Sequence, residues 1–287
     1  MDGPLTATAE PRTFIGVDGL VLRADQWAGA AGGDRPAILM LHGGGQTRHS
    51  WKSTATYLGD AGFDVIALDS RGHGDSEWAP DGDYSVEAIT ADVVAVLRSI
   101  ARPVVLIGAS MGGLTGLLAT AIAPELVRAL VMVDIVPDIE DVGRDRIESF
   151  MRGGMEGFAT LDDAADAIAE YLPHRSRPYN QDGLRRNVRQ GADSRWYWHW
   201  DPAFLASERT DPGLYRDDFD AAARSLTVPL LLLHGVKSDI VSESGIARML
   251  ELAPHASVVH LAAAAHTAAG DDNEAFSQAV IDFVSTL

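Results

Sequence analysis

Residues 103–113, PVVLIGASMGG, decide how this sequence folds. The run PVVLI is short, apolar and rich in β-branched residues, as in strands buried on both faces. Residues 114–123, LTGLLATAIA, follow with the apolar character of a buried helix. Between them Gly108-Ala109-Ser110-Met111-Gly112 forms a G-x-S-x-G pattern, whose glycines permit a sharp turn that lifts the serine oxygen clear of the sheet. A serine that only caps the helix is the alternative; the strand and helix on either side favour a nucleophile at Ser110.

Other short apolar runs repeat along the chain and alternate with stretches of helical periodicity. They are residues 37–42 (AILMLH), 64–68 (DVIAL), 130–136 (LVMVDIV), 229–233 (PLLLL) and 257–261 (SVVHL). Strands that alternate with helices pair in parallel through right-handed crossovers, so the sequence predicts a doubly wound, mostly parallel α/β sheet. Residues 13–27, with a turn at Asp18-Gly19, predict an antiparallel hairpin at the sheet edge.

Residues 137–225 interrupt this alternation. They contain helical segments and many arginines, but no strand of the buried type, and the alternation resumes at Thr227. The interruption predicts a helical cap, residues 137–225, inserted between two parts of one core, residues 1–136 and 226–287.

Charge and composition exclude several kinds of function. The chain has 41 acidic and 23 basic residues, and its formal charge of −18 disfavours nucleic acid and anionic membranes as partners. It has no cysteine, which excludes disulfides and thiolate chemistry. The sequence has no H-E-x-x-H or comparable motif and neither of the glycine-rich nucleotide motifs, so we expect no metal and no cofactor.

The expected partner is a small-molecule substrate, and the sequence leaves homo-oligomerisation open. The opening residues MDGPLTATAEP lack a basic stretch followed by an apolar core, and no later run approaches the length of a membrane span. We therefore expect a cytoplasmic protein.

Five motifs, in this chain order, resemble those of the α/β-hydrolase fold superfamily. They are HGGG at 42–45, DSRGHGDS at 69–76, GASMGG at 108–113, HGVKSD at 234–239 and AAH at 264–266. The resemblance covers nearly the whole chain except the cap. The first two motifs resemble the branch that holds esterases, C–C bond hydrolases, perhydrolases and epoxide hydrolases. Epoxide hydrolases of that branch carry aspartate at the nucleophile position, whereas Ser110 implies acyl transfer to water.

The resemblance also implies a catalytic triad in the chain order serine, acid, histidine. Of the nine histidines, only His266 follows the last expected strand, in a loop before a helix expected to begin near Asp271. We therefore predict His266 as the base that takes the Ser110 proton. Asp239, which follows the strand at 229–233, is the predicted acid, and Asp134, at the end of the preceding strand, is its rival.

An acyl transfer also needs two backbone donors for the oxyanion of its tetrahedral intermediate. Met111 follows the nucleophile and is predicted to supply one donor. Gly44, in the loop after the first central strand, is predicted to supply the other. Lipases of another branch also carry HGGG, and a resemblance to them would imply that Gly45 shares this role.

The cap offers an aromatic cluster in which we expect Trp196 and Trp198 to bind substrate. The predicted function is hydrolysis of a small to medium hydrophobic carboxylic ester or lactone through an acyl-enzyme. One alternative is C–C bond hydrolysis, in which a substrate carboxylate would need cap arginines such as Arg185, Arg186, Arg189 or Arg195. The sequence also leaves open a cofactor-free perhydrolase, and a binding protein that keeps the fold without turnover.

Overall fold

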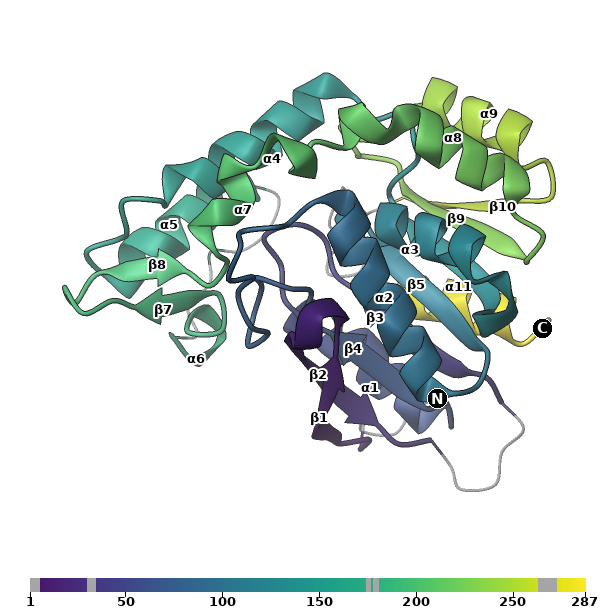
Figure 1. The fold of residues 1–287 in the computed structure, drawn as a ribbon, viewed down its shortest axis with the longest axis horizontal. Helices are drawn as coiled ribbons and strands as arrows, with labels where there is room; N and C mark the ends of the chain where they lie inside the picture. The colour runs from purple at the N-terminus through teal and green to yellow at the C-terminus, as the bar shows by residue number, and fades with distance from the viewer. Residues whose placement is uncertain (1–5, 30–34, 174–176, 178–180, 263–272) are drawn as a thin grey trace.

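The computed structural model describes residues 6–29, 35–173, 177, 181–262 and 273–287. In these residues one sheet of eight strands forms the centre of the molecule, with helices on both of its faces (Figure 1). The order of the strands is β1-β2-β4-β3-β5-β6-β9-β10. All neighbours from β4 to β10 pair in parallel, while β1 with β2 and β2 with β4 are antiparallel. The predicted doubly wound, mostly parallel sheet is confirmed.

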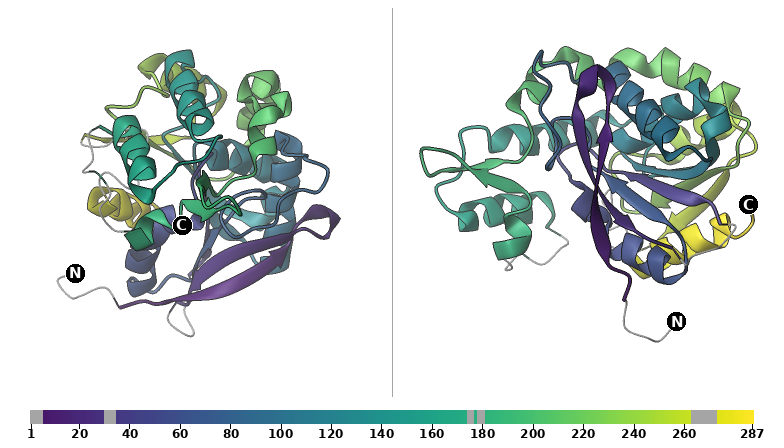
Figure 2. Two further views of the ribbon diagram at one scale, coloured as in Figure 1. Left: turned by 90° about the vertical axis from the view of Figure 1, so that its left-hand side faces the viewer. Right: turned by 60° about the horizontal axis from the view of Figure 1, so that its bottom comes forward.

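The strands lie close to the predicted runs. Their bounds are β1 Ala9–Ile15, β2 Val21–Trp27, β3 Ala37–Leu41, β4 Val65–Leu68, β5 Val104–Ala109, β6 Val127–Val133, β9 Leu230–Gly235 and β10 Ser257–Leu261. The predicted hairpin at the sheet edge is β1 and β2, joined by the short 3-10 helix Val17–Gly19. Figure 2 shows it running along one side of the molecule. Strand β6 begins and ends three residues before the predicted run at 130–136. It ends at Val133 because the backbone leaves the extended conformation at Asp134, where φ is 48°.

Helices cover the two faces of the sheet unequally. On one face lie α2 (Val86–Ile100), α3 (Met111–Ile122), α8 (Arg216–Ser225) and α9 (Glu243–Leu252), packed on the larger apolar core. On the other face α1 (Lys52–Asp60) and α11 (Asn273–Val284) lie against each other. The central strands are buried on both sides, which is why their sequences are continuously apolar.

The insertion lies on the left side of Figure 1. Its buried apolar residues pack in a cluster that also includes Ala79, Tyr84 and Ile89 of the core part. The elements of the insertion are α4 (Asp141–Gly153), α5 (Leu161–Tyr171), α6 (Gln181–Leu184), β7 (Val188–Gln190), β8 (Trp196–Trp198) and α7 (Pro202–Ala206). The hairpin β7–β8 was not predicted, because its strands of three residues are too short to show an alternating pattern.

Helix α8 falls within the predicted cap range 137–225 but packs with the core. Phe219 is fully buried in the larger core cluster, and α8 contacts α3 and α9. We therefore propose that the insertion ends before α8, earlier than residue 225. None of the helices among the described residues has both the length and the apolar character needed to cross a membrane.

Candidate active site

Ser110 lies on the turn between β5 and α3, at the carboxyl edge of the sheet. Its backbone has φ 48° and ψ −120°, a conformation that few residues other than glycine adopt. The Ser110 N–H donates to the carbonyl of Val133 at 3.3 Å, and the Ser110 carbonyl accepts from the N–H of Gly113 at 2.8 Å. The strained turn is thus held by strand β6 on one side and by the first turn of α3 on the other.

The glycines of the G-x-S-x-G pattern allow the backbone segments to approach closely. A Cβ added at Gly108 would lie 2.2 Å from the carbonyl oxygen of Gly112, and one added at Gly112 would lie 2.5 Å from that of Leu41. Backbone atoms cannot move aside as a flexible side chain can. The turn therefore requires glycine at both positions, as the sequence pattern implied.

The loop of residues 42–46, here named the glycine loop, lies beside Ser110, and a Cβ on Gly43 would lie 3.2 Å from the Cβ of Ser110. The Gly43 N–H donates to the side-chain oxygen of Gln46 at 3.3 Å, and the Gly45 N–H donates to Nε2 of His73 at 3.2 Å. No acceptor among the described residues contacts the N–H of Gly44. Of the two glycines considered as oxyanion donors, Gly45 is thus already engaged and Gly44 is not.

Three buried histidines brace the glycine loop against residues 69–76, here named the second loop. Nε2 of His42 accepts the N–H of Ser70 at 3.0 Å, while its Nδ1 lies 2.8 Å from the carbonyl of Gly43. His73 contacts Gly45 through Nε2 and the carbonyl of Arg71 through Nδ1 at 3.1 Å.

The third histidine, His199, follows β8 and links the cap to both loops. Its Nδ1 accepts the N–H of Gly74 at 2.8 Å, and its Nε2 lies 3.3 Å from the carbonyl of Gly45. Each ring therefore accepts a backbone N–H at one nitrogen and faces a carbonyl with the other. Only the neutral imidazole can make both bonds.

Burial keeps these imidazoles neutral. It lowers the pKa of His42 from 6.5 to about 4, an effect to which the Arg48 charge adds, and it lowers the pKa of His73 to about 3. Burial likewise brings the pKa of His199 well below 6.5. Nothing in the sequence shows that these three rings, which belong to separate segments of the chain, are buried around one loop.

The two candidate acids have different surroundings. The Asp134 side chain is buried, and its carboxylate accepts the N–H of Gly235 at 2.9 Å and the hydroxyl of Ser238 at 2.5 Å. Asp134 directly follows Val133, the residue that holds the Ser110 turn. The carboxylate is thus fixed at the same sheet edge as Ser110.

Asp239 lies on the turn after β9, and about a third of its side chain is exposed. Its carboxylate forms a bidentate pair with Arg146 of α4, with both N–O distances at 2.9 Å. The contacts therefore associate Asp239 with the cap. His266, the predicted base, lies outside the described residues.

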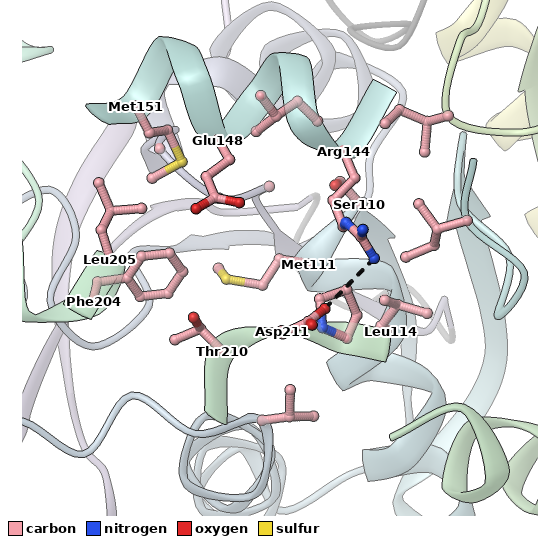
Figure 3. A pocket seen from close by; sticks show the side chains of 18 of the residues that line it. Ser110, Met111, Leu114, Arg144, Glu148, Met151, Phe204, Leu205, Thr210 and Asp211 are labelled. Carbon is pink, nitrogen blue, oxygen red and sulfur yellow. Dashed lines mark ion pairs between the residues drawn. The ribbon is translucent and has the colours of Figure 1, made fainter. Parts of the chain in front are cut away.

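A cavity of about 790 Å³ lies between the sheet edge and the cap (Figure 3). Ser110, Met111 and Gly44 all line it, so the structure brings three of the predicted site residues together. The apolar side chains of its wall come from the core, from α4 and α7, and from the residues just before α4 and between α7 and α8: Val86, Met111, Leu114, Ile135, Ile139, Ile147, Phe150, Met151, Phe204, Leu205, Leu214, Phe219 and Ile240.

The charged side chains on the described wall are balanced. Arg144 pairs with Asp211 at 3.9 Å across the cavity, as Figure 3 shows, and also with Asp141 at 3.0 Å on its own helix. Arg152 pairs with Glu148 at 2.7 Å. Both wall arginines are therefore matched by carboxylates.

The predicted substrate contacts Trp196 and Trp198 lie elsewhere. Neither is among the residues that line the cavity. Trp198 is buried in the cap, stacked on Trp200 with ring centroids 5.1 Å apart and packed against Phe150 at 5.1 Å. Phe150 itself lines the cavity, so Trp198 supports the wall from behind.

Comparison with known proteins identifies the family of this chain. The family model for the alpha/beta hydrolase fold matches residues 36–272. The chain belongs to the α/β-hydrolase family. The named relatives of this α/β-hydrolase, an esterase and a hydrolase, support hydrolase activity.

Two curated relatives cover most of this α/β-hydrolase. Esterase Rv0045c of Mycobacterium tuberculosis is 32% identical over 236 residues, covering 80% of this chain and 76% of its own. The 2-(acetamidomethylene)succinate hydrolase of Mesorhizobium japonicum is 30% identical over 259 residues, covering 88% and 89%. The crystal structure of an E-2-(acetamidomethylene)succinate hydrolase superposes with a TM-score of 0.83 at 26% identity, covering 97% of this chain and 100% of that one.

The buried histidines predict a specific acid sensitivity. In the unfolded chain they protonate near pH 6.5, whereas His42 and His73 stay neutral in the fold down to about pH 4 and about pH 3. Between these values the unfolded state binds more protons, so the free energy of unfolding should fall as the pH is lowered from about 6.5, by about 1.4 kcal/mol per pH unit for each histidine. Urea unfolding followed by tryptophan fluorescence, from about pH 7 to about pH 4.5, measures this slope.

The variant His73→Phe removes one of these groups. Its slope should be smaller than that of the unmodified protein by about 1.4 kcal/mol per pH unit. His255→Gln is the matched control, because His255 is exposed, and it should keep the original slope. Equal slopes for His73→Phe and the unmodified protein would contradict the assignment.

Proposed function

We propose that this chain is a serine hydrolase that cleaves small to medium apolar carboxylic esters or lactones through an acyl-enzyme. The observation that carries the proposal is the position of Ser110, on a strained turn at the wall of an apolar cavity and next to the first N–H groups of α3. A helix N-terminus favours the negative charge that develops in acyl transfer.

In the proposed reaction, His266 takes the proton of the Ser110 hydroxyl as the oxygen attacks the acyl carbon. The N–H groups of Met111 and Gly44 donate to the oxygen of the tetrahedral intermediate. The C–O bond to the alcohol breaks as His266 returns the proton to the leaving oxygen. Water, deprotonated by the same histidine, then releases the acid and restores Ser110.

For the acid that orients the histidine, we propose Asp134 in place of Asp239. Asp134 is buried beside the strand that holds the nucleophile turn, and two hydrogen bonds fix its carboxylate. A buried, fixed carboxylate can hold an imidazole in one tautomer. The bidentate pair with Arg146 instead engages Asp239 with the cap.

The cavity supports an uncharged, apolar acyl group. Its wall is mostly apolar, and burial of such surface stabilises a hydrophobic substrate by about 25 cal/mol per Å². The name of the Mesorhizobium relative specifies a succinate derivative, which would need cations for its carboxylates. Here Arg144 and Arg152 are already paired with wall carboxylates.

The cap arginines considered for a C–C bond hydrolase do not supply that cation either. The Arg185 guanidinium lies over the Trp196 ring at 5.0 Å, and Arg195 donates to the carbonyl of Glu156 at 3.0 Å. Arg189 donates to the carbonyl of Gly74. None of the four, Arg186 included, lines the described cavity, which favours ester hydrolysis over C–C cleavage.

The nucleophile is tested by covalent labelling. A fluorophosphonate probe should add to Ser110, because the activated hydroxyl attacks phosphorus as it attacks acyl carbon. Peptide mass spectrometry locates the adduct. Ser110→Ala should lose the label, and its kcat for p-nitrophenyl butyrate should fall by at least roughly 10³-fold. Labelling at another serine, with activity retained by Ser110→Ala, would refute the proposal.

The acid is tested with the pair Asp134→Asn and Asp239→Asn. We expect Asp134→Asn to lower kcat/KM by roughly 10²- to 10⁴-fold, since the amide no longer stabilises the imidazolium. Asp239→Asn breaks a partly exposed ion pair and should change kcat/KM by less than about threefold. Circular dichroism establishes that both variants fold. The reverse order of effects would return the role to Asp239.

The charge balance of the cavity predicts substrate preference. We expect kcat/KM for p-nitrophenyl butyrate to exceed that for the p-nitrophenyl half-ester of succinic acid by at least about tenfold, because that carboxylate finds no unpaired cation. Asp211→Asn releases one partner of Arg144 and should raise the relative kcat/KM of the half-ester by about two- to fivefold. A half-ester preferred by the unmodified enzyme would show that the substrate is anionic.

A further inference from the structure

A second cluster of chemically active side chains lies on the sheet outside the catalytic cavity. His234, near the end of β9, and His260, on β10, occupy paired positions in neighbouring parallel strands. Glu243 is the first residue of α9, which connects these two strands. The possible ligand atoms of the three side chains all lie within 4.8 Å of one another. We propose that His234, His260 and Glu243 bind a late first-row transition metal ion such as Zn²⁺.

The distance between the imidazoles suits a shared ion. Nδ1 of His234 lies 3.0 Å from Nδ1 of His260. Two nitrogens bound to one ion at about 2.0–2.1 Å lie about 2.9 Å apart at a right angle and about 3.4 Å apart at the tetrahedral angle. The two rings thus need to separate by only a few tenths of an ångström for tetrahedral Zn²⁺.

The two imidazoles carry the same number of protons with and without a bound metal ion. Two Nδ1 atoms in contact share one proton, so one ring donates and the other accepts. When both Nδ1 atoms bind a metal, the donating ring places its proton on Nε2 instead, and both rings stay neutral. The ion thus takes the place of the shared proton, and neither imidazole has to gain or lose a proton.

The donor set and its exposure select the kind of ion. Two imidazoles and one carboxylate suit Zn²⁺, Ni²⁺ and Cu²⁺, whereas Mg²⁺ and Ca²⁺ prefer oxygen ligands throughout. His234 is buried, while His260 and Glu243 are exposed. The ion therefore has a fixed ligand beneath it and open access from solvent, where water can complete its coordination.

The sequence shows no metal motif here, because the three ligands are spread over residues 234–260 and meet only through the parallel register of β9 and β10. None of them lines the described cavity. The proposed ion therefore has no direct contact with a substrate in that cavity. His234 and Glu243 also bound the segment whose Gly235 and Ser238 hold Asp134, so an ion would tie the two ends of that segment together.

Zn²⁺ binding to the full chain, free of any affinity tag and stripped with chelator, tests the proposal. Isothermal titration should show a Zn²⁺ site that persists in excess Mg²⁺, which suppresses weak association with the −18 charge of the chain. Binding should raise the thermal midpoint of unfolding, because the ion binds only the folded arrangement. His260→Gln and Glu243→Gln should each weaken Zn²⁺ binding by at least about tenfold.

The controls separate this site from other histidines. His255→Gln, at another exposed histidine near β10, and His266→Ala, at the predicted base, should both bind Zn²⁺ as the unmodified protein does. His260 and Glu243 are exposed, so their variants should keep the metal-free thermal midpoint. Failure of the unmodified chain to bind Zn²⁺, or unchanged affinity in His260→Gln, would overturn the proposal.

Discussion

The close approach of backbone segments around Ser110 is the constraint on which the rest of the site depends. Gly108, Gly112 and the carbonyl of Leu41 lie so near to one another that no side chain fits between them. The resulting positive-φ conformation at Ser110 costs free energy of order 1–3 kcal/mol. Hydrogen bonds from β6 and α3 hold the turn in place. The orientation of Ser110, the proposed nucleophile, therefore depends on the packing of neighbouring strands and of α3.

In the loops outside the sheet, imidazole side chains form the hydrogen bonds to the backbone that neighbouring strands form inside the sheet. The glycine loop and the second loop carry backbone N–H and carbonyl groups that are buried but have no neighbouring strand to pair with. His42, His73 and His199 satisfy them, each with one donor and one acceptor. Because His199 belongs to the cap, the position of the glycine loop depends on the cap being docked.

The core could be predicted from sequence because its signals are local. Apolar runs marked the central strands, and G-x-S-x-G between a strand and a helix placed Ser110 on its turn. The walls of the cavity could not be predicted, since which face α4 presents to Ser110 depends on packing between segments far apart in sequence. For that reason Trp198, which the sequence suggested as a substrate contact, lies behind Phe150 and away from the cavity.

The choice between Asp134 and Asp239 as the acid also depends on packing that the sequence does not show. Asp134 and Asp239 follow neighbouring parallel strands, so both reach the same sheet edge, and spacing alone cannot separate them. Their contacts differ: a Cβ on Gly143 of α4 would lie 2.4 Å from the carbonyl of Asp239, whose carboxylate also pairs with Arg146 of that helix. Asp239 therefore contacts the cap, while the hydroxyl of Ser238, in the same turn, donates to the carboxylate of Asp134. One short turn after β9 thus contacts both α4 of the cap and Asp134, the residue proposed as the acid.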